Sequence, residues 1–157
     1  MCDRLDHGES TDDIADYFMN SDAYASMLRI YRLHDDDADF VDSFIRRTYL
    51  TCMGRGVDES GLEYFGGMIR DGEMSPMELV NTLIASEEYT GRGYSTAHTV
   101  ISIYILYTDS YPDMSVVNSY AEQIDSGTMT YEDLEVRLEG TIAYREMIRD
   151  YNLDEYI

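Results

Sequence analysis

The fold of this chain is decided by residues 71–89, which read DGEMSPMELVNTLIASEEY. A glycine precedes Ser75, and an acid, Glu78, stands three residues after that serine. This spacing is typical of a capping box, in which the hydroxyl accepts from an exposed amide at the start of a helix while the carboxylate reaches back. Pro76 at the first helical position strengthens the prediction, because proline lacks the amide that would be unsatisfied there. We therefore expect a helix near 76–85.

The same plan occurs twice more, in residues 7–24 and 126–144. A second hydroxyl residue followed by a tyrosine closes each copy, so a second helix is expected to begin there. The equivalent positions are Ser10, Ser75 and Thr130, then Ser21, Ser86 and Thr141, then Tyr24, Tyr89 and Tyr144. Self-similarity on this scale indicates stacked supersecondary units. The repeating unit is predicted to be a helix, a tight turn and a helix.

Two further helices are expected ahead of the motif, in residues 40–72. Apolar residues fall at helical spacing along the first part, Gly54 is expected to end that helix, and Asp58 is expected to cap the next one. Residues 98–127 have a related pattern, in which Asp113 matches Asp58. The front half of the unit is therefore predicted to occur twice.

The chain is thus expected to be all-α, with about ten short helices in three degenerate stacked repeats and no β-sheet. The helices are placed near residues 11–20, 22–34, 38–53, 59–70, 76–85, 87–93, 96–108, 114–125, 131–139 and 142–153. Residues 1–157 are treated as a single helical repeat domain, with a partial repeat at 1–36, a full repeat at 37–93 and a degenerate repeat at 94–157.

Charge excludes several classes of partner. The chain has 32 acidic and 11 basic residues, and its formal net charge is −21. Such a charge repels nucleic-acid backbones and anionic membrane surfaces, so no direct nucleic-acid binding is expected. The longest apolar run, 100–107, is far shorter than the ~20 residues that cross a bilayer, so no membrane insertion is expected and the run is predicted to be a buried helix. The isolated chain is expected to be a monomer.

The N-terminal residues do not suggest a secretion signal, because they lack a basic stretch followed by an apolar one. We therefore expect a cytoplasmic location if the chain stands alone, and a surface location if it is a fragment of a larger protein.

No arrangement of residues points to catalysis or to a metal. Cys2 and Cys52 are far apart, and the three histidines have no partner at metal-ligand spacing. The acidic run that follows His34 lacks the glycine and the terminal glutamate of an EF-hand loop, so a helix cap with solvated charge is the stronger interpretation there. We expect no enzyme, no cofactor and no metal.

Residues 54–65, GRGVDESGLEYF, together with 71–89 resemble a bacterial helical repeat of unknown function. Its signature is of the type Leu-Gly-Arg-x-Pro-Asp-x-x-Gly-x-x-Tyr-Trp, and here Val57 stands for the proline and Phe65 for the tryptophan. Repeats of this type occur in surface and S-layer-like proteins and attached to glycosyltransferases, and they are distantly similar to phycobilisome linker domains. The resemblance implies an all-helical, non-catalytic module.

Four residues of this motif are candidates for binding: Arg55, Asp58, Tyr64 and Phe65. A turn that presents a guanidinium, a carboxylate and aromatic rings suits a sugar or a carboxylate-bearing partner. In the alternative interpretation, Arg55 bonds carbonyls at the end of one helix and Asp58 caps the next.

Two functions follow from these observations. The first is a non-enzymatic interaction module that binds a carbohydrate or protein partner as part of a bacterial surface or glycan-processing protein. The alternative is a stand-alone acidic inhibitor that mimics nucleic acid and occupies a basic groove of a partner protein. The mimic requires carboxylates in rows on one face, whereas a solvated acidic surface scatters them.

Overall fold

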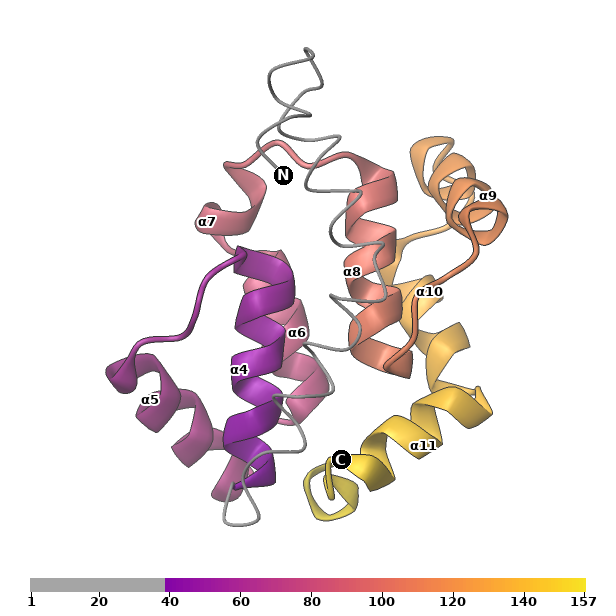
Figure 1. Cartoon of the computed structure of the whole chain (residues 1–157). Helices are drawn as coiled ribbons and strands as arrows, with labels where there is room; N and C mark the ends of the chain where they lie inside the picture. Colours follow the sequence, from indigo (N-terminus) through magenta and orange to yellow (C-terminus); the bar gives the residue numbers. More distant parts are fainter. Residues whose placement is uncertain (1–38) are drawn as a thin grey trace, which may run out of the picture. The chain divides into compact units, whose positions relative to one another are not determined.

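The computed structural model describes residues 39–157, and all regular elements in that range are helical (Figure 1). The α-helices are α4 (Phe40–Met53), α5 (Glu59–Arg70), α6 (Pro76–Ile84), α7 (Glu87–Thr90), α8 (Thr96–Thr108), α9 (Met114–Asp125), α10 (Tyr131–Glu139) and α11 (Ile142–Asp150), and a short 3-10 helix, η1, spans Asp154–Tyr156. The predicted all-α class is confirmed for these residues. About ten helices were expected for the whole chain and eight lie here; the two expected near 11–20 and 22–34 fall outside the described residues.

Each of these α-helices begins at a side chain that accepts a hydrogen bond from a backbone amide. The caps are Asp39, Asp58, Ser75, Ser86, Ser95, Asp113, Thr130 and Thr141. Ser75 and Thr130 form complete capping boxes with Glu78 and Asp133, as the sequence predicted. Ser10, the third member of that predicted set, lies outside the described residues. Short-range capping therefore fixes where the helices start.

The two longest helices end in left-handed backbone. Gly54 follows α4 with φ 58°, and Asp109 follows α8 with φ 50°. Glycine adopts this conformation without steric cost, whereas aspartate is one of the few other residues that tolerate it. The stop predicted at Gly54 is thus confirmed, and Asp109 ends the later helix in the same way.

Helix bounds recur at a constant separation along the chain, as shown by the two capping boxes (130 − 75 = 55). The bounds of α5 and α6 reappear 55 residues later as those of α9 and α10, with no insertion or deletion. In each set the glycine in the intervening turn, Gly72 or Gly127, has φ 72°. The α5–α6 and α9–α10 segments therefore share one backbone plan.

Two predicted helices are shorter in the structure than expected. The helix expected at 87–93 ends at Thr90, because the residues that follow are the turn of Gly91 and Gly93, and Gly93 has φ 66°. The helix expected at 142–153 ends at Asp150, because Asn152 has φ 48° and cannot continue a right-handed helix.

Helix α8 lies in the middle of the described residues, between α4 and α6 on one side and α9, α10 and α11 on the other (Figure 1). Its buried residues face nearly all directions, as expected for a helix that is surrounded by others. The predicted burial of the apolar run 100–107 is confirmed, although Ile101 and Tyr104 within it are only partly buried. Helix α4 is also surrounded by other helices: besides α8, it packs against α5, α6 and α7.

Candidate functional site

Arg55 forms a two-pronged ion pair with Glu88 of α7. Its Nε and Nη2 donate to the two carboxylate oxygens at 2.9 and 2.7 Å, and its Nη1 donates to the carbonyl of Gly56 at 3.1 Å. The hydrogen bond from Arg55 is the main cause that lowers the pKa of Glu88 to about 2. A guanidinium held by a bidentate carboxylate is already satisfied. Arg55 thus connects the turn after α4 to α7, rather than bonding the carbonyls that end α4.

Asp58 caps α5, as predicted. Its Oδ1 accepts from the amide of Gly61 at 2.7 Å and from the hydroxyl of Ser60 at 2.8 Å. These bonds favour the ionised form, and they lower the pKa of Asp58. The carboxylate therefore has a structural task at the start of α5 while its side chain remains exposed.

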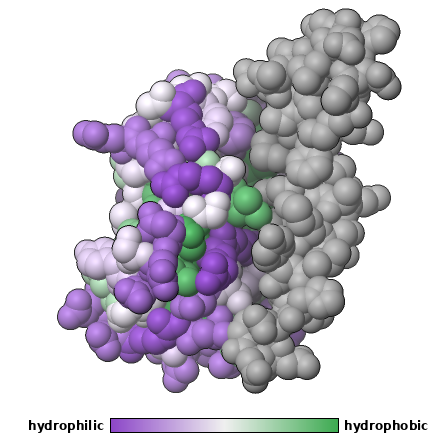
Figure 2. Space-filling view, turned by 60° about the vertical axis from the view of Figure 1, so that its left-hand side comes forward, coloured by the Kyte–Doolittle hydropathy of each residue, from purple (hydrophilic) through white to green (hydrophobic). Residues whose placement is uncertain are grey.

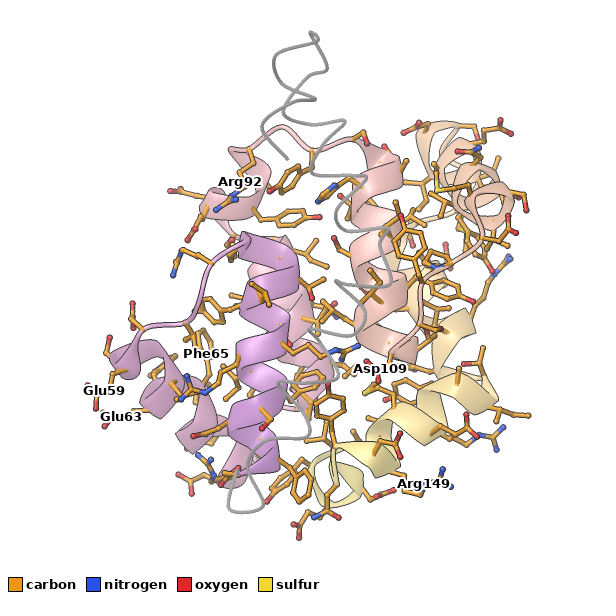
Figure 3. All side chains as sticks on the ribbon, in the orientation of Figure 1. Glu59, Glu63, Phe65, Arg92, Asp109 and Arg149 are labelled. Carbon is orange, nitrogen blue, oxygen red and sulfur yellow. The ribbon has the colours of Figure 1, made fainter. Side chains whose placement is uncertain are left out.

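The two candidate aromatic residues point in different directions. The Phe65 ring lies 6.1 Å from that of Tyr49 on α4, so Phe65 faces the interior (Figure 3). Tyr64 is 61% exposed and meets Phe65 edge to face at 5.1 Å. The four candidates therefore do not converge: Arg55 faces α7, Asp58 caps its own helix, Phe65 packs inward and Tyr64 faces solvent.

Sequence reasoning missed an exposed network that continues from Glu88. Arg92 lies 3.2 Å from the Glu88 carboxylate and donates to the hydroxyl of Tyr94 at 3.1 Å. The Tyr94 ring stacks on His98, with ring centroids 3.9 Å apart. His98 is thus packed against an aromatic ring, while His7 and His34 lie outside the described residues. The sequence signal for this network is the GRGYS turn at 91–95, which places an arginine and a tyrosine shortly after Glu88.

A cavity of about 440 Å³ lies between α4 and α5. We call it the α4–α5 cavity, and its lining residues are Asp42, Arg46, Val57, Asp58, Glu59, Leu62, Glu63 and Arg70. Figure 2 views the molecule from the side of α5 and α7, where hydrophilic residues cover most of the surface and a small hydrophobic area lies among them. Asp58 is the one predicted binding residue in this lining. The sequence did not reveal the cavity, because its walls come from two helices.

The charged groups of the α4–α5 cavity differ in how far they are already paired. Arg70 lies 2.7 Å from a carboxylate oxygen of Asp39 and 2.6 Å from one of Asp42. Within residues 39–157, no ion pair involves Arg46, Glu59 or Glu63. Figure 3 shows Glu59 and Glu63 beside each other on α5, and both side chains are exposed. Among the described residues, one guanidinium and two carboxylates at this cavity therefore have no ion-pair partner.

Cys52 is not a reactive thiol. It is buried, and burial raises its pKa to about 12, so the thiol stays protonated at neutral pH. In the part of the chain that the structure describes, no group of three or more histidine, cysteine, aspartate or glutamate residues is arranged to hold a metal ion. None of the described helices is both long and apolar enough to cross a membrane.

No protein-family model matches the chain, and neither a curated protein nor a solved structure is similar to it. The resemblance of 54–65 and 71–89 to the bacterial helical repeat therefore stays a prediction.

Proposed function

We propose that this chain is a non-enzymatic interaction module that binds a protein partner at the α4–α5 cavity. The observation that carries the proposal is a cavity of about 440 Å³ lined by Arg46, Glu59 and Glu63, which make no ion pair with any residue of 39–157. Binding pockets typically have volumes of roughly 300–1,000 Å³, with an apolar surface and a few directed polar groups. Val57 and Leu62 supply the apolar surface here.

The proposal includes three degenerate stacked repeats. The constant separation of 55 residues between the two capping boxes supports a full repeat at 37–93 and a degenerate one at 94–157. The partial repeat at 1–36 lies outside the described residues. A place in a bacterial surface or glycan-processing protein is also part of the proposal, and it rests on the sequence resemblance.

A protein partner suits this cavity better than a carbohydrate. Sugars are commonly held against aromatic faces, and no aromatic residue is among the described residues that line the α4–α5 cavity. Tyr64 and Phe65 lie on α5 outside this lining. Charged side chains over an aliphatic surface instead match the mixed polar and apolar character of a polypeptide.

The nucleic-acid mimic is less well supported, because many carboxylates have local tasks. Asp39, Asp58 and Asp113 cap helices, and Glu78 and Asp133 complete capping boxes. Their positions follow from helix starts, so there is no need to explain them by a partner's phosphate-binding groove.

The proposal is tested by screening the labelled chain against a peptide array, a glycan array and a panel of nucleic-acid-binding proteins. Each screen is run at about 0.05 M and about 0.5 M salt, since screening weakens exposed charge pairs. The decisive variant is Glu59→Gln/Glu63→Gln. Its matched control is Glu122→Gln/Glu146→Gln, which removes the same charge from exposed sites on α9 and α11.

We expect peptide binding that the cavity variant loses and the control retains. Salt-insensitive glycan binding that Tyr64→Ala abolishes would replace the proposal with a carbohydrate module. Capture of a basic protein that both double variants weaken equally would replace it with the mimic, because a mimic depends on total charge.

A further inference from the structure

The α4–α5 cavity can be compared with the equivalent place in the second half of the same chain. Each lining residue has an equivalent 55 residues later, in or beside α8 and α9. Two features persist between the two places: Asp58 and Asp113 both cap a helix, and Leu62 and Val117 are both apolar residues of the core or packed against it. These shared features, a helix cap and an apolar core contact, are what both helix pairs need in order to fold.

The remaining charges of the cavity do not persist. Asp42, Arg46, Glu59, Glu63 and Arg70 are replaced at the equivalent positions by Ala97, Ile101, Met114, Asn118 and Asp125. Helix α9 nevertheless has the same length as α5 and the same kind of cap. The charged set is therefore not required to form this helix pair, and Arg46, Glu59 and Glu63 also make no ion pair among the described residues.

We infer that the α4–α5 cavity binds a peptide segment in which an arginine or lysine stands next to an acidic residue. This inference rests on the function proposed above and specifies the ligand. The cationic group of the segment lies between Glu59 and Glu63 of α5. Its aliphatic stem lies on Val57 and Leu62, and the neighbouring carboxylate pairs with Arg46 of α4.

The arrangement of charges determines which group of the peptide meets which side chain of the cavity. Glu59 and Glu63 are four residues apart on one helix, so their side chains are neighbours and both can reach one cation. Arg46 on the facing helix offers five donors in a planar fork, which suits a carboxylate. Long basic side chains commonly lay their methylene groups on apolar surface while the charged end meets polar groups. The net charge of −21 also attracts a basic segment over longer distances.

The test uses the whole chain labelled with nitrogen-15 and the blocked peptide acetyl-Gly-Arg-Glu-Gly-amide. We expect amide shift changes concentrated at residues 42–46 and 57–63. Replacing either the arginine or the glutamate of the peptide by glutamine should weaken binding about tenfold, since each removes a charge-assisted contact. Equal binding of all three peptides, or shift changes elsewhere only, would overturn the inference.

Three variants complete the test. Glu59→Met/Glu63→Asn installs the residues that the chain itself uses at the equivalent positions, Met114 and Asn118, so it is compatible with the helix pair. It and Arg46→Ile should each weaken peptide binding about tenfold or more, whereas Glu122→Gln/Glu146→Gln should change it less than about twofold. Unchanged binding in Glu59→Met/Glu63→Asn would contradict the inference.

Failure of this inference is distinguishable from failure of the proposed function. If the peptide does not bind but the array screen yields a protein ligand that Glu59→Gln/Glu63→Gln loses, the interaction module stands and the ligand chemistry is wrong. If neither the peptide nor any array ligand depends on Glu59 and Glu63, both are wrong.

Discussion

The guanidinium of Arg47, on α4, lies 3.1 Å from the carboxylate of Asp109, the residue that ends α8. Arg47 also donates to the carbonyls of Ile105 and Leu106 in the last turn of α8. The Ile105 carbonyl also accepts from the amide of Asp109 at 2.9 Å, so Arg47 adds a second donor at the end of α8, where carbonyls commonly lack amide partners. Arg47 is only 5% exposed, so the two central helices are joined by a largely buried charged contact.

Arg47→Ala should therefore destabilise the fold strongly. Removing one partner of a buried pair typically costs about 3–5 kcal/mol, and we expect about 3 kcal/mol because Asp109 is partly exposed. Urea denaturation measures the change in the free energy of unfolding. The neighbouring exposed residue provides the control, since Arg46→Ala should change stability by less than about 0.5 kcal/mol. If Arg47→Ala destabilised the chain no more than Arg46→Ala does, the contact between α4 and α8 would be unimportant for stability.

Loss of the cap hydroxyl should destabilise the chain by a similar, smaller amount at either capping box. Ser75→Ala and Thr130→Ala each leave a helix amide without its acceptor, and each should lower the free energy of unfolding by about 1 kcal/mol. Thr82→Ala is the control, because the Thr82 hydroxyl donates to a carbonyl inside α6 and caps nothing. Thermal denaturation of the three variants is sufficient; a loss in Thr82→Ala as large as that in Ser75→Ala would argue against capping as the cause.

The ion pair of Glu88 should stabilise the folded chain at neutral pH, and this stabilisation should be lost in acid. Hydrogen bonding to Arg55 lowers the pKa of Glu88 from 4.5 to about 2 in the folded chain. The stabilisation is therefore fully present above pH 4.5 and is lost as the pH falls through about 2. The melting temperature of Glu88→Gln should lie below that of the wild type at neutral pH, and the two should converge in acid. Glu87→Gln, its exposed neighbour, should follow the wild type at every pH, and a pH-independent gap for Glu88→Gln would contradict this account.

Added salt should raise the melting temperature. Repulsion among the carboxylates of a chain with net charge −21 disfavours the folded state, and salt screens it over about 10 Å at 0.1 M. The melting temperature is compared at about 0.05 M and about 0.5 M sodium chloride. Glu122→Gln/Glu146→Gln, with two fewer charges, should respond less. An unchanged melting temperature in the wild type would mean that the charges are already paired or far apart.

The helix starts could be predicted because the interactions that fix them are local. Ser75 and Glu78 are three residues apart, and Asp58 meets the amide of Gly61, so each signal lies within one short stretch of sequence. The end of α7 differs from the prediction because the helix was expected to continue through Gly91 to Gly93, whereas these residues form a turn in which Gly93 adopts a positive φ. Helix starts, whose capping contacts lie within a few residues, were therefore easier to predict than this helix end.

The candidate site could be predicted only in part, because its contacts join distant residues. Arg55 and Glu88 are 33 residues apart, and nothing in the sequence distinguishes Glu88 from the other 31 acids as the partner (32 − 1 = 31). Arg46 and Glu63 likewise share a cavity only because α4 and α5 pack side by side. Asp58 was predicted correctly as a cap, since that task is local.

The equal lengths of α5 and α9, of α6 and α10, and of the turns between them have a genetic consequence. Recombination that replaces residues 59–84 by 114–139 leaves every helix and turn at its original length. Such an exchange would carry Met114 and Asn118 into the positions of Glu59 and Glu63 and leave the caps intact. The charged surface of α5 can therefore be gained or lost by copying one short coding segment over the other, while the lengths of all helices and turns stay the same.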